Sequence, residues 1–161
     1  MGFFMNCLGI FYIYHMTIVK ATKKQISKLV PLFDAYRVFY KQISNPEAAR
    51  NFLSERFKKK DSTIFLAVDD EGNGLGFTQL YPSFSSVAIQ RTYILNDLFV
   101  TAEARGKGVG EALMNHAKQF AIDQGARGVT LETDVTNPAQ KLYERLGWKK
   151  DTYVFHYTWE V

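Results

Sequence analysis

Residues 105 to 110 read Arg-Gly-Lys-Gly-Val-Gly, so glycine occupies every second position of a short basic turn. Without side chains at these positions, several backbone N–H groups can converge on one small volume. An amphipathic helical pattern begins at Val109, and a helix start favours anions because of its unpaired N–H groups and its dipole. Arg105 and Lys107 add two formal positive charges. This combination favours the binding of a pyrophosphate.

The spacing of the glycines argues against the two commonest phosphate loops. A nucleoside-triphosphate loop needs Gly-Lys followed by Ser or Thr, which occurs nowhere in the sequence. A dinucleotide fingerprint needs a further glycine at the position that Glu111 occupies. For the loop taken alone, a glycine-rich turn that binds nothing stays an alternative.

The segment resembles the coenzyme A loop of the GNAT superfamily of N-acetyltransferases, whose pattern is Gln or Arg, two residues, Gly, one residue, then Gly or Ala. Arg105, Gly108 and Gly110 match it, and the resemblance extends to LETDVTN (131–137) and LYERLGW (142–148). It implies acetyl-CoA as co-substrate. By this resemblance the pyrophosphate would be held by Arg105, Gly106, Lys107, Gly108, Val109 and Gly110, the pantetheine arm by the backbone of Leu98, Phe99 and Val100, and the pantetheine amide by Asn137.

Tyr143 is the candidate general acid. It lies in a helical pattern from Pro138 to Leu146 that ends at Gly147, where a core tyrosine with a satisfied hydroxyl is the alternative. In proteins of the GNAT type, a tyrosine in this helix faces the thioester sulfur. With an unperturbed pKa of about 10, a phenol keeps its proton at neutral pH and can give it to a departing thiolate.

The group that takes the proton of the acceptor amine is left open. In the polyamine-acetylating relatives, a glutamate at the position of Asn96 is thought to act as base through water, and Asn96 cannot do so. The neighbouring Asp97 points to the opposite face of a regular strand, so it would serve only through a local bulge. Glu132 and bulk water are the alternatives. Asp97 is our candidate, and pairing with a nearby basic group is its alternative role.

The resemblance implies an N-acetyltransferase that acts on a primary amine of a small molecule or protein, by direct attack on the thioester. A non-catalytic, regulatory acyl-CoA-binding module is the alternative; Tyr143 favours the enzyme, and Asn96 favours the module. In the family the acceptor is chosen by the first two helices and the closing strands, which here contain Tyr36, Arg37, Tyr40 and the segment from Phe155 to Trp159.

The elements that must position these residues alternate along the chain. We expect an α/β domain with the GNAT fold, a mixed and mostly antiparallel sheet with flanking helices, in which the strands joined across the 109–124 helix are parallel. Strands are predicted over 17–21, 63–69, 75–82, 93–100 and 128–134, and helices over 22–40, 46–60, 109–124 and 138–146. Residues 83–89 are predicted as a polar loop, and the aromatic segment 148–161 as one strand or a hairpin.

Composition limits the remaining choices. The 161 residues suit one domain at 16–161, preceded by an apolar extension at 1–15 that is short of the ~20 residues needed to span a bilayer. A net charge of +4, spread along the chain, fits an anionic cofactor, and we expect no nucleic acid or membrane partner. The single Cys7 excludes an internal disulfide framework and favours the cytoplasm, and no Cys/His set has metal-ligand spacing. Exchange of the aromatic end segment between subunits would give a homodimer.

Overall fold

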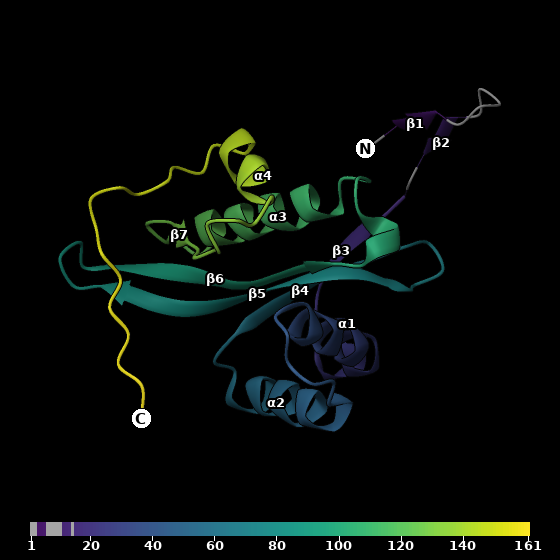
Figure 1. Cartoon of the computed structure of the whole chain (residues 1–161), viewed down its shortest axis with the longest axis horizontal. Coiled ribbons are helices and arrows are strands. Elements are labelled where there is room, and N and C mark those ends of the chain that lie inside the picture. The colour runs from purple at the N-terminus through teal and green to yellow at the C-terminus, as the bar shows by residue number, and fades with distance from the viewer. Residues whose placement is uncertain (1–2, 6–10, 14) are drawn as a thin grey trace.

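The computed structural model describes residues 3–5, 11–13 and 15–161. A five-stranded sheet, ordered β3-β4-β5-β6-β7, lies between two layers of helices (Figure 1). Its strands are β3 (Thr17–Lys20), β4 (Thr63–Val68), β5 (Gly74–Ser85), β6 (Gln90–Val100) and β7 (Val129–Thr130). All neighbouring strands are antiparallel except β6 and β7, which are parallel as predicted.

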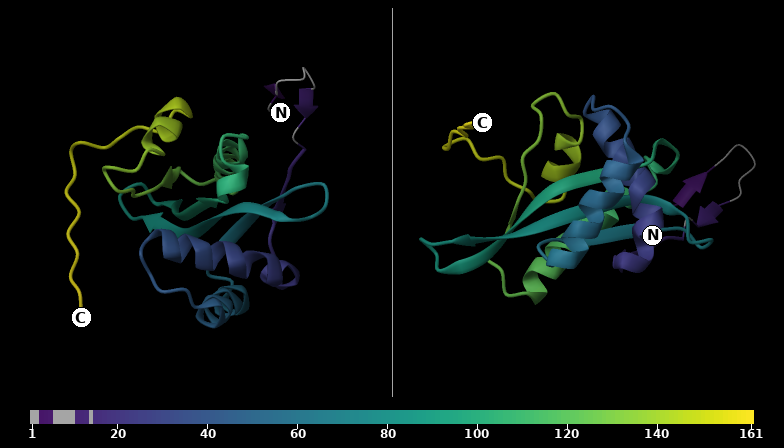
Figure 2. Two further views of the ribbon diagram at one scale, coloured as in Figure 1. Left: turned by 45° about the vertical axis from the view of Figure 1, so that its right-hand side comes forward. Right: turned by 90° about the horizontal axis from the view of Figure 1, so that it is seen from below.

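Two helices cover one face of the sheet: α1 (Ile26–Phe39) and α2 (Pro46–Lys59) (Figure 2). The predicted start signals are confirmed. Thr22 and Gln25 form a capping box at the short 3-10 turn that leads into α1, and the Asn45 side chain accepts the Ala48 N–H at the start of α2. Their apolar side chains pack against inward residues of β4 and β5. Leu29 of α1, Leu53 of α2 and Phe77 of β5 are fully buried in this cluster.

Helix α3 (Val109–Asp123) covers the other face and begins where the sequence predicts. Val109, Leu113 and Ala117 recur at helical spacing and are buried against Leu80 and Leu95 of the sheet. Gly125 follows in the left-handed conformation and ends the helix. A short helix, α4 (Gln140–Arg145), lies on the same side of the sheet as α3.

Three of the predicted boundaries are wrong. Residues 83–85, predicted as loop, are strand, and β6 begins at Gln90 and not at Tyr93, because β5 and β6 continue as a long hairpin. Residues 131–134 are not strand, because they diverge from β6 and form no ladder with it. The helix predicted over 138–146 is confined to Gln140–Arg145 and is preceded by a turn.

The closing segment is the largest departure from expectation. Residues 148–161 form neither a strand nor a hairpin, and the chain runs away from the body as an extended, exposed tail (Figure 1). Tyr153, Phe155, Tyr157 and Trp159 are each more than four-fifths exposed, so nothing in the described chain covers their alternating aromatic pattern.

The first residues lie outside the five-stranded sheet. β1 (Phe3–Met5) and β2 (Phe11–Ile13) pair with each other as a separate antiparallel sheet. The rest of the predicted 1–15 extension, apart from His15, lies outside the described residues. In the described part of the chain, no helix has the length and apolar character needed to cross a bilayer.

Candidate active site

A cavity of about 280 Å³ opens where the two parallel strands separate. β6 pairs with β7 only at Tyr93 and Ile94. β6 then continues to Val100, while the segment after β7, residues 131–133, turns away from it. The gap is closed by α1 on one side and by α3 and α4 on the other. Ten of the lining residues are Tyr36, Tyr40, Asn96, Leu98, Phe99, Val100, Arg105, Gly110, Asn137 and Tyr143.

Seven predicted site residues therefore meet at one cavity. Leu98, Phe99 and Val100 form its β6 wall, Gly110 and Arg105 lie at the end near α3, and Asn137 and Tyr143 approach from α4. Gly106, Lys107, Gly108, Val109 and Asp97 do not line it. Val109 is fully buried in the core under α3, so only its backbone can serve a ligand.

The glycine turn has a backbone conformation that favours glycine. Gly106 and Gly108 have φ angles of +72° and +81°, the left-handed region in which other residues are strained. Gly108 is the N-cap of α3, so the first N–H groups of that helix have no earlier turn to bond. A side chain at Gly110 would contact Leu142 and Val100 across the cavity at 3.4 and 3.7 Å. The turn thus fits a diphosphate at its backbone and an extended chain alongside.

Arg105 does not extend over the glycines. Its Nε donates to the Val100 carbonyl oxygen at 3.2 Å, which folds the exposed side chain over the end of β6. Together with Phe39 and Phe99 it separates the cavity from a larger open groove of about 700 Å³ along α1. Tyr143, Asn137 and the glycines at 106, 108 and 110 do not line that groove, so we assign the chemistry to the smaller cavity.

Tyr143 lies near Thr133. Asn137 Nδ2 donates to Thr133 Oγ1 at 3.0 Å, and the same threonine lies close enough to the Tyr143 phenol to influence its pKa. Burial raises the pKa of the Tyr143 phenol above its usual range, against the opposing influence of Thr133. A phenol that stays protonated inside a half-buried cavity can donate a proton and does not readily act as a base.

β6 contains the bulge on which the Asp97 hypothesis depends. Gln79 pairs with Asp97 and Leu80 with Leu95, so Asn96 is the extra residue. The insertion turns Asp97 away from α3, the side that Leu95 faces, and toward Gln79. Asn96 is exposed and lines the cavity, whereas Asp97 is only 4% exposed and lies behind it. The alternative role for Asp97 was to pair with a basic group, and the hydrogen bonds of its carboxylate come from the amides of Gln79 and Asn96 instead.

Asp97 is surrounded by amide and phenol groups. Gln79 Nε2 and Asn96 Nδ2 each donate to one of its carboxylate oxygens at 3.0 Å. The Tyr36 hydroxyl, from α1, donates to the Asn96 carbonyl oxygen at 3.4 Å and is close enough to the Asp97 carboxylate to influence its pKa. Burial is the largest influence and raises the pKa of the Asp97 carboxyl, although these three side chains oppose it. A raised pKa suits a group that must take a proton near neutral pH.

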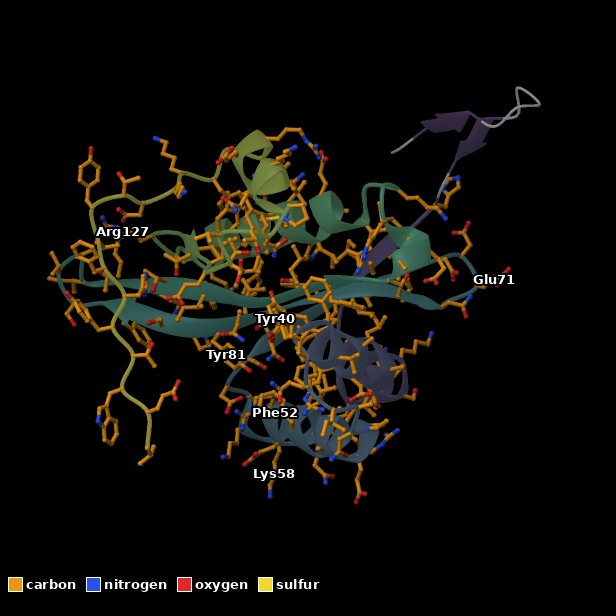
Figure 3. All side chains as sticks on the ribbon, in the orientation of Figure 1. Tyr40, Phe52, Lys58, Glu71, Tyr81 and Arg127 are labelled. Atoms are coloured by element: carbon orange, nitrogen blue, oxygen red, sulfur yellow. The ribbon has the colours of Figure 1, made fainter. Side chains whose placement is uncertain are left out.

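Further phenols surround this carboxylate on the α1 side of the sheet. Burial, followed by the negative charge of Asp97, raises the pKa values of Tyr40 and Tyr81, the latter to about 12. Figure 3 shows Tyr40 and Tyr81 in the layer between the sheet and helices α1 and α2. Gln79 Nε2 also contacts the Tyr81 hydroxyl, and its own Oε1 is buried without a partner among the described residues.

Sequence reasoning missed Gln79, Tyr81 and Thr133. A weak signal was present for the first two, since a glutamine and a tyrosine two positions apart share one face of an otherwise apolar strand. Thr133 carries no such signal, because its role depends on where α4 lies. The other proposed base, Glu132, lines the cavity but is three-quarters exposed and pairs with His156 of the tail at 3.0 Å.

Comparison with known proteins agrees with this geometry. The sequence model of the Acetyltransferase (GNAT) family matches residues 29–148. An uncharacterized N-acetyltransferase of Bacillus subtilis is 44% identical over 91% of this chain and 98% of that protein. A crystal structure of a probable acetyltransferase covers 90% of this chain and 97% of its own, at 45% identity and a TM-score of 0.86. An aminoglycoside N-acetyltransferase in complex with CoA shares the fold at 20% identity, covering 93% of this chain and 98% of its own, with a TM-score of 0.76.

Proposed function

Because the chain belongs to the GNAT family of acetyltransferases, which use acetyl-CoA, we propose that it transfers the acetyl group to a primary amine with Tyr143 as general acid. The chain is an acyltransferase, rather than the non-catalytic module that its sequence left open. The observation that carries the proposal is the shared cavity. It joins the β6 backbone, the start of α3 and Tyr143 in one continuous wall.

The residues present fit coenzyme A in an extended form. The first N–H groups of α3 and the glycine turn would hold the diphosphate, with Arg105 and Lys107 contributing charge. The backbone of Leu98, Phe99 and Val100 would pair with the pantetheine arm where β7 leaves β6 unpaired. Asn137 would contact a pantetheine amide from the α4 side of the cavity.

The chemistry then divides between two sides of the cavity. On the α4 side, Tyr143 protonates the sulfur as the carbon–sulfur bond breaks. On the α1 side, Asp97 receives the proton that the acceptor ammonium must lose before its nitrogen can attack. The net result is an N-acetyl amide, a free thiol and one proton released to water.

The first test is a thiol-release assay with acetyl-CoA and a panel of primary amines. We expect amine-dependent release, and a fall of about 10² to 10⁴-fold in kcat for Tyr143→Phe, the usual contribution of a general acid. Phenylalanine keeps the ring and removes only the proton donor. Equal rates for wild type and variant with every amine that reacts would exclude Tyr143 as the acid.

We further propose that the tail pairs with a second copy of the chain in a homodimer. Support comes from its alternating exposed aromatics and from exposed apolar residues Phe84, Val87 and Ile89 at the β5–β6 hairpin. An extended segment with one apolar face is the pattern of a strand that packs on a surface. The cytoplasm, predicted from the lone Cys7, stays our expectation for where the enzyme works.

A further inference from the structure

We infer that Tyr36 is a catalytic residue that carries the acceptor's proton from the cavity to Asp97. The inference rests on the proposed function, since it concerns the proton that the acceptor amine loses. It extends that function by assigning a role to a side chain of α1, on the opposite wall of the cavity from Tyr143.

Asp97 needs an intermediary because an acceptor cannot reach it. The side chain is 4% exposed, is absent from the cavity wall and accepts hydrogen bonds from Gln79 and Asn96 on its two oxygens. Asn96 lies between Asp97 and the cavity, but an amide N–H neither gains nor loses a proton at neutral pH. Among the described residues that line the cavity, this leaves Tyr36 as the ionisable group whose hydroxyl can turn to the Asp97 carboxylate.

Tyr36 has the geometry of a relay. Its ring is half-buried between α1 and the sheet, in edge contact with Phe77, Phe99 and Tyr40. Its hydroxyl donates to the Asn96 carbonyl oxygen at 3.4 Å, and the neighbouring Asp97 carboxylate is the second acceptor that this hydroxyl can address. A hydroxyl rotates about its C–O bond, so its hydrogen can turn toward the carboxylate while a lone pair faces the cavity.

The transfer balances in one concerted step. The oxygen of Tyr36 accepts a proton from the acceptor ammonium while its own O–H proton passes to the Asp97 carboxylate. The amine becomes neutral, Asp97 becomes a carboxylic acid, and the phenol ends as it began. A free phenolate never forms, which agrees with the environment, because burial and the charge of Asp97 raise the pKa of Tyr36 far above its usual range.

The surroundings of the pair contain other ionisable groups, and they define the control. Tyr40 at the end of α1, Tyr81 of β5 and Tyr143 of α4 face it, and each is a phenol with a raised pKa. Tyr40 lies one turn beyond Tyr36 and lines the same cavity. In the part of the chain that the structure describes, it feels the charge of Asp97 without a hydrogen bond to it. Tyr40→Phe therefore removes the same hydroxyl group at the end of the same helix and leaves Tyr36 and Asp97 in place.

The test is the pH dependence of kcat/KM for Tyr36→Phe, Tyr40→Phe and wild type with one amine substrate. For Tyr36→Phe we expect a loss on the order of 100-fold at pH 7. This loss should shrink as the pH approaches the amine pKa of about 10.4, where the acceptor is already neutral. Any loss for Tyr40→Phe should be the same factor at every pH. A pH-independent loss for Tyr36→Phe overturns the relay and leaves the acetyltransferase proposal intact.

A second measurement needs no turnover and keeps the inference testable if the acceptor is not found. Thermal unfolding of Tyr36→Phe, Asp97→Asn and the double variant reports whether the two side chains interact energetically in the protein without ligand. We expect the double variant to lose less in melting temperature than the two single losses combined. Additive losses overturn the inference, whereas failure of every amine in the thiol assay contradicts only the proposed function.

Discussion

At the scale of single residues, one inserted position in β6 sets the surroundings of Asp97, our candidate base. The bulge at Asn96 turns Asp97 toward α1, where it meets Gln79 and Tyr36 and is shielded from water. In a regular strand Asp97 would share a face with Leu95, under α3. Asn96, which lines the cavity, contributes an amide, and the next residue, Asp97, is our candidate base.

The glycine at position 108 gives the sharpest prediction at this scale. Gly108→Ala should weaken acetyl-CoA binding by about tenfold, because the left-handed φ of +81° costs alanine about 1–2 kcal/mol and relaxation would move the first N–H groups of α3. Isothermal titration calorimetry measures this change in affinity.

The matched control for that change is Gly125→Ala. Gly125 has a φ of +62° at the opposite end of the same helix, so alanine there meets similar strain far from the cavity. Both variants should lose similar thermal stability, and Gly125→Ala alone should keep the wild-type affinity. Equal affinity losses for the two variants would contradict a specific role for the glycine turn.

At the scale of elements, the junction of α1 and α2 is fixed by one buried carboxylate. Asp34 accepts from Ser44 Oγ at 2.5 Å, from the Asn45 N–H at 2.7 Å and from Arg37 Nη1 at 3.4 Å. It thereby joins α1 to the residue that caps α2. The hydrogen bond from Ser44 is the largest of the influences that lower the pKa of the Asp34 carboxyl.

Asp34→Asn should reduce the stability of the fold by about 2 kcal/mol, or roughly 4–8 °C in melting temperature. The pH dependence has a definite sign. The folded pKa lies below the unfolded value of about 3.9, so Asp34 stabilises the fold above that value and ceases to do so as the pH falls through it toward the folded pKa.

Melting curves between pH 7 and pH 2.5 check this prediction. The difference between wild type and Asp34→Asn should be full at pH 7 and smaller at the acid end. Asp70→Asn, the same substitution in an exposed turn, should change little at any pH. A difference for Asp34→Asn that persists undiminished in acid would mean that the carboxylate charge is not what joins the helices.

At the scale of the whole molecule, the tail beyond Trp148 has the alternating sequence pattern of a β-strand but forms no strand. If it pairs with a second copy, light scattering of the full chain should give twice the 18.5 kDa chain mass. Replacing Tyr157 and Trp159 by serine should shift the mass toward one chain, because both lie on the aromatic face of the pattern. Thr158→Ser, on the other face, should leave the mass unchanged. A single-chain mass for the wild type at high concentration would contradict the dimer.

The sequence predicted what depends on neighbouring residues and missed what depends on distant ones. The cap at Asn45, the start of α3 at Val109 and the stop at Gly125 are local signals, and all three are confirmed. The end of β7 at Thr130 depends on where the chain diverges from β6. The conformation of the tail depends on the surface that it packs against, so neighbouring residues predict neither feature. The surroundings of Asp97 depend on the register of β5 against β6. A bulge in β6 entered the sequence-based prediction only as a condition for Asp97 to act as base.

The most direct test of the whole account is the melting temperature of the full chain with and without acetyl-CoA. A ligand that binds only the native protein raises its stability by about 2.7 kcal/mol when present at a hundred times its dissociation constant. We predict a rise of several degrees with acetyl-CoA that is reduced in Gly108→Ala and retained in Gly125→Ala. An unchanged melting temperature of the wild-type protein at millimolar acetyl-CoA would contradict the assignment of the cavity between β6 and α4.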